Sequence, residues 1–122
     1  MRYRDRFDFV AVYVREAHPT DGWRMESNDK AGVAIAQPKT NQERVRAADL
    51  CCTALEMKIP IVIDSIDNAT ERAYSAFPDR LYLIDRGGRV AYKGGRGPFG
   101  YSPRELEQAM LLLLADERFQ RL

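Results

Sequence analysis

The sequence predicts a single α/β domain that spans residues 1–122. Short apolar runs rich in β-branched residues alternate with segments whose apolar residues recur at the spacing of an α-helix. Two late apolar runs are separated by a short turn that contains glycine, which is typical of a hairpin, and a last helical pattern follows them. A chain of 122 residues is long enough for one domain and too short for two.

Composition excludes several classes of protein. Hydrophobic residues make up 45% of the chain and charged residues 30%, which is ordinary for a globular domain. The net charge of +1 gives no electrostatic reason to expect a nucleic-acid partner. No apolar stretch is long enough for a signal peptide or for crossing a membrane, so a cytoplasmic protein without a membrane partner is expected. The two cysteines, Cys51 and Cys52, are adjacent, which leaves neither a disulfide framework nor zinc-type spacing.

The first half of the chain is predicted to contain a strand, a long loop, a helix and a second strand. Residues 7–14 form a nearly continuous apolar run, which predicts a strand covered on both faces. Residues 15–39 are expected to form an irregular loop, with a short strand at 32–37 as an open alternative. A capping box at Thr40-Asn41-Gln42-Glu43 starts a predicted helix over residues 40–57. Its apolar face is expected to be Val45, Ala48, Cys51 or Cys52, and Leu55, and residues 59–63 are a second buried strand.

The second half is predicted to contain a short helix over 67–76, a hairpin and a final helix. Residues 81–84 and 90–92 flank a turn whose glycines suit the positive φ angles of a tight hairpin. A second capping box at Ser102-Pro103-Arg104-Glu105 starts a helix to about residue 119, with Leu106, Met110, Leu111, Leu113 and Leu114 as its apolar face. This order of elements is typical of a thioredoxin-like fold, a central sheet flanked by helices.

The only histidine, His18, directly follows the first predicted strand. Ligand sites in open α/β sheets lie beyond the carboxyl ends of strands, which makes His18 a candidate catalytic residue. Glu16 lies two residues before it, and a carboxylate beside an imidazole raises the imidazole pKa and fixes its orientation. The alternative is a surface histidine before a proline, and the sequence leaves both open.

Two further segments contain candidate substrate contacts. Trp23 is the only tryptophan, and a buried aromatic that anchors its loop is the favoured alternative. Residues 94–101 have four glycines around Arg96, which can hold an anion or a developing negative charge. An irregular connector to the last helix explains the same residues equally well.

Cys51 and Cys52 lie in the middle of the predicted helix over residues 40–57. A reactive thiolate usually needs a helix N-terminus or a basic neighbour. Neither is evident here, so packing is favoured over a redox role. Asp64, at the end of the second strand, is expected to be a turn or cap residue.

Three segments together resemble the iodothyronine deiodinase family and its bacterial relatives. They are residues 13–23, 80–84 and 92–101, with the sequences YVREAHPTDGW, RLYLI and YKGGRGPFGY, and the resemblance extends from about Tyr3 to Leu114. Domains of this family are thioredoxin-like and close to the peroxiredoxin variant. They remove iodine reductively from thyroid hormones with a selenocysteine or cysteine nucleophile and a thiol reductant.

The resemblance also implies roles for individual residues. It makes His18 the family's active-site histidine, which binds substrate or transfers a proton. Glu16 matches the acidic residue of the same motif, and Tyr13 matches the tyrosine before it. Arg96 matches the arginine of the glycine-rich loop, a candidate contact for the carboxylate end of the substrate. His18 and Arg96 are therefore expected to face one cleft.

The sequence also departs from the family pattern. No cysteine precedes Cys51, so the family's nucleophile and its supporting first strand are not found at matching positions. Pro38 stands near the position of a second family histidine, and Arg15 stands in place of a family acid. A cysteine that some members have before the second strand is not found at Ile59 or Pro60.

The first β–α unit of the family fold is therefore expected to be missing or incomplete. In the thioredoxin-like sheet that strand is central, and without it buried backbone groups lose partners at a cost of about 1 kcal/mol or more each. A gene start further upstream, direct pairing of the two sheet halves, or a strand from a second chain would each resolve this. The first is the favoured explanation.

The resemblance implies a thiol-dependent oxidoreductase domain, for reductive dehalogenation or related redox chemistry, that is inactive as this chain because the nucleophile is absent. Two alternatives are a non-catalytic binding or assembly module and a redox protein that uses Cys51 or Cys52. No metal or bound cofactor is expected beyond a thiol reductant as electron donor. The expected partner is a small molecule such as a halogenated aromatic, and a homodimer is left open.

Overall fold

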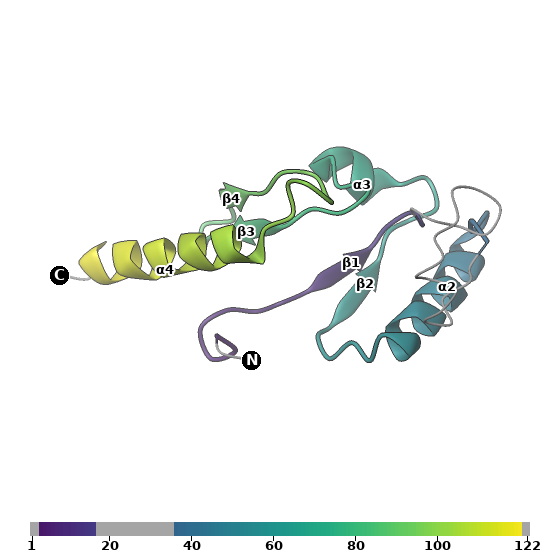
Figure 1. Cartoon of the computed structure of the whole chain (residues 1–122), viewed down its shortest axis with the longest axis horizontal. Coiled ribbons are helices and arrows are strands. Elements are labelled where there is room, and N and C mark those ends of the chain that lie inside the picture. Colours follow the sequence, from purple (N-terminus) through teal and green to yellow (C-terminus); the bar gives the residue numbers. More distant parts are fainter. Residues whose placement is uncertain (1–2, 17–35, 121–122) are drawn as a thin grey trace. The chain divides into compact units, whose positions relative to one another are not determined.

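The computed structural model describes residues 3–16 and 36–120 of the α/β chain. The chain divides into two compact units, Met1–Tyr74 and Ser75–Leu122, and each is described by itself. The first contains β1 (Ala11–Tyr13), α2 (Asn41–Ala54), β2 (Ile61–Ile63) and α3 (Ala69–Tyr74), and the second contains β3 (Tyr82–Ile84), β4 (Val90–Lys93) and α4 (Pro103–Gln120) (Figure 1). This mixture of helices and small sheets is consistent with the expected thioredoxin-like fold, and a single domain over 1–122 stays a prediction.

The two strands of the first unit, β1 and β2, pair in parallel. Ala11 lies opposite Ile61 and Tyr13 lies opposite Ile63. The ladder continues past the strands, because the Asp64 amide donates to the Tyr13 carbonyl at 2.9 Å. Parallel pairing brings the carboxyl ends of both strands to one edge of the sheet. The residues that follow Tyr13 and Ile63 therefore meet there.

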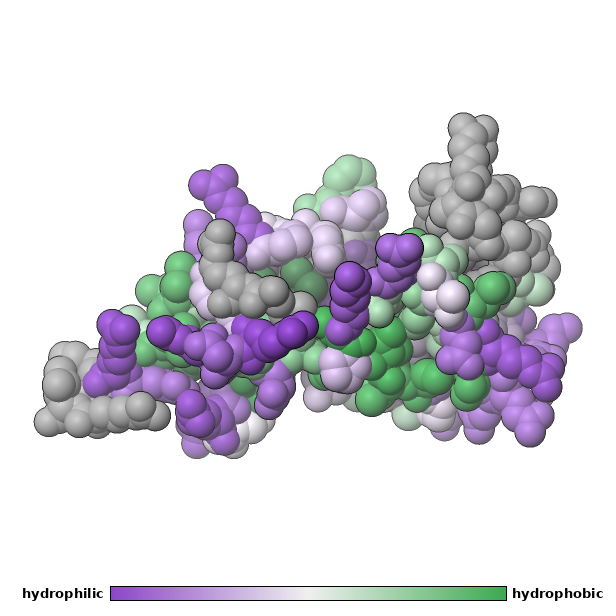
Figure 2. Space-filling view, turned by 90° about the horizontal axis from the view of Figure 1, so that it is seen from below, coloured by the Kyte–Doolittle hydropathy of each residue, from purple (hydrophilic) through white to green (hydrophobic). Residues whose placement is uncertain are grey.

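The faces of this strand pair differ in exposure. Val10, Val12 and Val62 alternate onto one face and are 58%, 40% and 51% exposed. Tyr13, on the other face, packs against Ala47 of α2. Figure 2 shows hydrophobic surface gathered over this part of the chain. Within the first unit, α2 packs on the Tyr13 face, and the predicted cover of the valine face is not found among the described residues of that unit.

The predicted start of α2 is confirmed. Thr40 is its N-cap, and the Thr40 hydroxyl accepts a hydrogen bond from the Glu43 amide at 3.1 Å. The Glu43 carboxylate in turn accepts from the amide of Lys39, the residue before the N-cap, at 2.6 Å, so Glu43 also holds the chain that enters the helix. The helix ends at Ala54, three residues before the predicted residue 57.

The buried face of α2 matches the predicted one at Ala48 and Cys51 and differs from it at Val45 and Leu55. Its buried residues are Arg44, Ala47 and Ala48, while Val45 is 43% and Leu55 is 55% exposed. The prediction failed at these two residues because the buried stripe begins with a charged residue, which shifts the apparent apolar face by one position.

The second unit begins with the predicted hairpin of β3 and β4. The strands pair antiparallel, with Leu83 opposite Tyr92, and the register shifts between Leu83 and Ile84. In the turn, the Asp85 carboxylate accepts from the amides of Gly87 and Arg89, each at 2.9 Å. Gly88 has a φ of +81°, the conformation for which glycine was expected here.

The last helix, α4, starts where the second capping box predicts. The Ser102 hydroxyl accepts from the Glu105 amide at 3.2 Å. The Glu105 carboxylate accepts from the Tyr92 hydroxyl at 3.1 Å, which ties α4 to β4. Met110 is buried at 4% exposure, but Leu111 is 50% exposed, so its predicted place on the apolar face is wrong. Leu111 is one residue, about 100° around the helix, from the buried Met110.

Candidate functional site

Tyr13 and Glu16 form a hydrogen-bonded pair at the carboxyl end of β1. The Tyr13 hydroxyl donates to Glu16 Oε2 at 2.7 Å. Burial, followed by the hydrogen bond to Glu16 and the charge of Glu16, raises the pKa of Tyr13 far above the ordinary tyrosine value. The phenol therefore keeps its proton at neutral pH and holds the Glu16 carboxylate in one place.

Cys51 approaches this pair from α2. It is half-buried and packs against Ala47, as Tyr13 does. Burial, then the charges of Glu16 and Cys52, raises the pKa of the Cys51 thiol. Its surroundings therefore disfavour the thiolate, the form that a nucleophile needs.

Arg44 is a residue of this site that sequence reasoning missed. It is 2% exposed, and its Nη1 donates to the Ser65 carbonyl at 2.5 Å, which ties α2 to the chain just beyond β2. Its positive charge acts on Tyr13 in the direction that lowers the phenol pKa, against the larger effects of burial and Glu16. The available signal was its spacing, since Arg44 shares a helical stripe with Ala47, Ala48 and Cys51.

Gln37 is the second residue that sequence reasoning missed. Its amide donates to the Glu16 carbonyl at 2.9 Å and accepts from the Glu16 amide at 3.2 Å. Gln37 lies outside every predicted helix and belongs only to the loop and to its alternative strand. No spacing rule links it to Glu16, which is 21 residues away.

Asp64 confirms its predicted role as a cap. It is 4% exposed, and its carboxylate accepts hydrogen bonds from the amides of Ser65, Thr70 and Glu71, each at 2.9 Å. Burial acts to raise the pKa of Asp64, but the hydrogen bonds outweigh it and hold that pKa below its usual range. Asp64 thereby fixes the start of α3 at the edge where Glu16 lies.

Arg15 and Glu71 join the segment after β1 to α3. Arg15 Nε lies 3.2 Å from Glu71 Oε1, with side-chain exposures of 41% and 9%. Glu71 is nearly buried, so the arginine supplies a compensating charge. The family resemblance predicts an acidic residue at position 15, and the ion pair with Glu71 gives a structural reason for the arginine found there.

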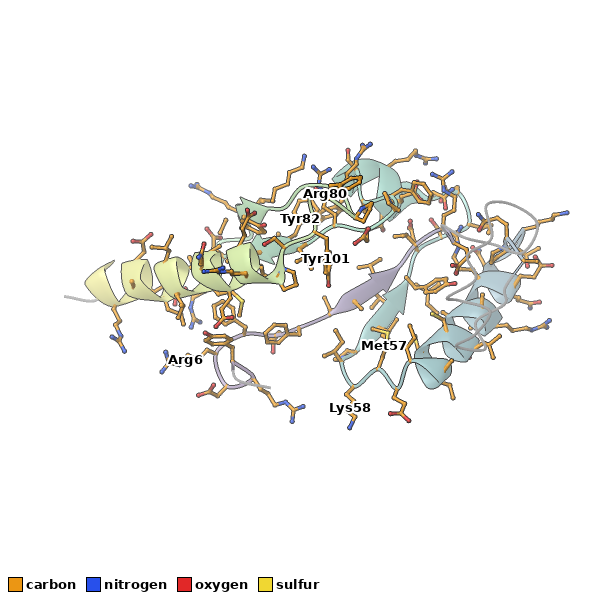
Figure 3. All side chains as sticks on the ribbon, viewed as in Figure 1. Arg6, Met57, Lys58, Arg80, Tyr82 and Tyr101 are labelled. Atoms are coloured by element: carbon orange, nitrogen blue, oxygen red, sulfur yellow. The ribbon has the colours of Figure 1, made fainter. Side chains whose placement is uncertain are left out.

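The glycine-rich loop in the second unit is held by backbone hydrogen bonds. The Gly94 amide donates to the Leu81 carbonyl at 2.9 Å and the Gly97 amide donates to the Asp79 carbonyl at 3.0 Å. Arg80 adds two more bonds, from Nε to the Gly94 carbonyl at 2.6 Å and from Nη1 to the Ser75 carbonyl at 2.9 Å (Figure 3). The loop therefore has a defined shape.

The glycines of this loop are needed for its own packing. A Cβ atom on Gly100 would lie 2.4 Å from the carbonyl carbon of Gly95, and one on Gly95 would lie 2.9 Å from the Gly100 Cα. Arg96 lies between them in sequence and is exposed. The backbone thus presents Arg96 to solvent, and the predicted substrate contact at Arg96 stays a prediction.

The structure brings together some of the predicted site residues. Tyr13 and Glu16 are hydrogen-bonded in the first unit, and Arg96 belongs to the second. His18 and Trp23 lie outside the described residues, so the predicted common cleft of His18 and Arg96 stays a prediction. Within residues 3–16 and 36–120, no group of three or more His, Cys, Asp or Glu side chains is placed to hold a metal ion.

Comparison with known proteins identifies the family. The iodothyronine deiodinase family model matches residues 1–112. The chain belongs to this family. Thyroxine 5-deiodinases of Sparus aurata, Gallus gallus and Ovis aries are 43%, 44% and 37% identical to it over 108, 102 and 108 residues. These matches cover 86%, 84% and 86% of this chain but 38%, 38% and 34% of the relatives, so the chain spans less than two-fifths of their length.

Membership in the iodothyronine deiodinase family confirms the resemblance drawn from residues 13–23, 80–84 and 92–101. The chain is therefore a domain of deiodinase type, and Tyr13 and Glu16 are its hydrogen-bonded pair at the carboxyl end of β1. Among the described helices, none is both long and apolar enough to span a membrane.

Proposed function

We propose that this chain carries the proton-handling and substrate-holding part of a thiol-dependent reductive dehalogenation. Thyroxine represents the substrate class, an iodinated aromatic, because the relatives are named thyroxine 5-deiodinases. The observation that carries the proposal is the 2.7 Å hydrogen bond from the Tyr13 hydroxyl to the Glu16 carboxylate, within the motif that also contains His18.

The reaction needs both electrons and a proton. An attacking sulfur or selenium takes the iodine from the ring, and the electron pair of the carbon–iodine bond stays on the ring carbon, which then takes up a proton. A second thiol attacks the sulfur or selenium, forms a disulfide or selenenyl sulfide, and releases iodide. A selenenyl sulfide then returns to the selenol by thiol exchange. In sum, the aryl iodide and two thiols give the deiodinated ring, a disulfide, iodide and a proton.

Glu16 is the proposed proton acceptor for the attacking thiol or selenol, and His18 the proposed proton donor to the ring carbon. Tyr13 supports Glu16, since its raised pKa keeps it a hydrogen-bond donor over the whole neutral range. Arg96 is the proposed contact for the substrate carboxylate, because a guanidinium binds a carboxylate with two parallel hydrogen bonds.

The attacking atom is proposed to come from outside residues 1–122. The raised pKa of Cys51 keeps its thiol protonated, which disfavours both a nucleophilic role and the alternative of a redox centre at Cys51 and Cys52. The proposal therefore predicts substrate binding by this chain, and turnover only when the attacking atom is supplied.

Binding is tested on the chain itself by calorimetric titration with thyroxine. We expect Arg96→Ala to weaken binding by about 10- to 150-fold, because a hydrogen bond between charged groups contributes about 1.5–3 kcal/mol. Arg104→Ala, an exposed arginine near the start of α4, is the matched control and should leave the affinity unchanged. Equal affinities for all three proteins would refute the role of Arg96.

Turnover is tested by segment exchange. The matching 102 residues of the Gallus gallus thyroxine 5-deiodinase are replaced by those of this chain, and iodide release from thyroxine is measured with dithiothreitol. We expect release, with a loss of about 10²-fold or more in Glu16→Gln and none in the exposed control Glu56→Gln.

Two results of the exchange would overturn the proposal. A folded exchange protein that binds thyroxine and releases no iodide would make this chain a binding module. Iodide release that disappears in Cys51→Ser would move the attacking atom to α2.

A further inference from the structure

Gln37 holds the backbone of Glu16 through two hydrogen bonds. Its Nε2 donates to the Glu16 carbonyl at 2.9 Å, and its Oε1 accepts from the Glu16 amide at 3.2 Å. A primary amide presents a neutral donor and a neutral acceptor side by side, as a neighbouring strand does. Gln37 therefore satisfies both main-chain groups of Glu16 at a point where none of the described strands pairs with it.

Glu16 needs this support because the strand ladder ends before it. The last backbone bond of the β1–β2 ladder runs from the Asp64 amide to the Tyr13 carbonyl, three residues earlier. Past that point Arg15 uses its side chain to reach Glu71, and this ion pair does not hold the Glu16 main chain. The two bonds from Gln37 are the main-chain contacts that fix the chain at Glu16 within the described residues.

The Tyr13–Glu16 hydrogen bond depends on the position of that main chain. The bond is 2.7 Å long, and a displacement of about 1 Å would take the two oxygens beyond hydrogen-bonding distance. Among the described residues, the other charged or titratable groups that act on Tyr13 are Cys51 and Arg44, both from α2. None of these groups replaces the acceptor that Glu16 provides, because Arg44 has donors only and a thiol is a weak acceptor.

We propose that Gln37 is a positioning residue of this site: its amide fixes the Glu16 main chain and thereby keeps the Glu16 carboxylate on the Tyr13 hydroxyl. The catalytic meaning of this role rests on the proposed function, whereas the positioning itself does not. Gln37 touches neither substrate nor reacting atoms in this scheme and acts through Glu16. Since Glu16 lies two residues before His18, the same two bonds anchor the chain that leads into the motif.

The test compares Gln37→Leu, which removes both bonds, with Gln42→Leu, an exposed glutamine on α2. Hydrogen–deuterium exchange of the Glu16 amide reports the main chain. We expect at least tenfold faster exchange in Gln37→Leu than in wild type, and no change in Gln42→Leu. Gln37→Glu keeps the acceptor for the Glu16 amide and loses the donor, so it serves as the milder variant if Gln37→Leu does not fold.

Ionisation of Tyr13 reports the carboxylate. Absorbance of tyrosinate at 295 nm is followed as the pH is raised over the range in which each protein stays folded by circular dichroism, and each protein is compared with the same protein carrying Tyr13→Phe. Tyr13 should ionise at a lower pH in Gln37→Leu than in wild type, because the contribution of Glu16 to its raised pKa is lost while the larger contribution of burial remains. In the Gallus gallus deiodinase that carries this chain in place of its matching segment, Gln37→Leu should lower kcat for iodide release about tenfold with little change in KM.

Three outcomes decide the proposal. Faster exchange together with ionisation of Tyr13 at a lower pH supports it. Unchanged exchange at Glu16 overturns the anchoring, and faster exchange with the titration of Tyr13 unchanged from wild type overturns the link from main chain to carboxylate. Amide exchange and tyrosinate absorbance are both measured without substrate. A failure of the dehalogenation proposal would therefore show in the iodide assay and leave these two measurements unaffected.

Discussion

Replacement of Asp64 by asparagine tests the hydrogen-bond network that fixes α3. Asp64 Oδ1 accepts from the amides of Ser65 and Thr70, and Oδ2 accepts from the amide of Glu71. Asparagine has one acceptor oxygen, so its amino group would face a buried N–H and leave it unsatisfied, at about 1–3 kcal/mol. The remaining two bonds also become neutral and weaker. We expect Asp64→Asn to lower the free energy of unfolding by about 2–4 kcal/mol.

The effect should depend on pH in a direction that the lowered pKa of Asp64 sets. In the unfolded chain an aspartate titrates near 3.9, and in the folded chain the hydrogen bonds hold the Asp64 pKa lower. The carboxylate therefore contributes its full stabilisation above about pH 4, and this is lost as the pH falls through the folded pKa. The difference between wild type and Asp64→Asn should be largest near pH 7 and should shrink in acid.

Urea denaturation followed by circular dichroism at pH 7 and at pH 3 measures both predictions. Asp49→Asn, on the exposed side of α2, is the matched control and should change the free energy of unfolding by less than about 0.5 kcal/mol. Wild-type stability for Asp64→Asn at pH 7 would show that the carboxylate does not bear these bonds. A difference that stays constant between the two pH values would contradict the assignment of its charge.

Two further predictions concern the glycine-rich loop and α2. Gly100→Ala should lower the free energy of unfolding by about 1–3 kcal/mol, because its Cβ would overlap Gly95. Gly88→Ala, in the β3–β4 turn, should lower it by about 1 kcal/mol from the positive φ alone, since nothing lies within 4 Å of that Cβ. Urea denaturation of both variants checks this order. Alkylation of Cys51 by iodoacetamide should be slow at pH 7.5, because burial and the charge of Glu16 raise the pKa of the Cys51 thiol. In a Cys52→Ser background, Glu16→Gln should make this alkylation faster. An unchanged rate would show that Glu16 does not act on this thiol.

Local signals in the sequence predicted most of the elements and some of their contacts. Thr40 and Ser102 are capping residues whose partners lie three positions along the chain, so the sequence pattern contains both halves of each contact. Asp64 was predictable as a cap for a related reason, because it stands between a strand and a short helix. Its partners at Thr70 and Glu71 are close in sequence.

The contacts that the sequence did not predict join residues far apart in the chain. Arg44 reaches Ser65 and Gln37 reaches Glu16, each across 21 residues, and neither pair matches a spacing rule. Arg44 also misled the prediction of the α2 face, because a buried arginine interrupts the apolar stripe that a pattern search looks for. Tyr13 and Glu16 could be assigned to one motif from the sequence. Their hydrogen bond depends on the main chain that Gln37 holds, and no sequence pattern indicates that contact.

The close approach of the Gly95 and Gly100 backbones has a consequence for how this loop can change over evolution. Its shape is encoded in the glycines and in the segment 79–81, which side-chain substitutions at other positions leave intact. Arg96 and Phe99, with Phe99 fully exposed, contribute nothing to that shape by packing. Selection can therefore replace both side chains, and with them the preference for a ligand, while the scaffold of the loop stays fixed.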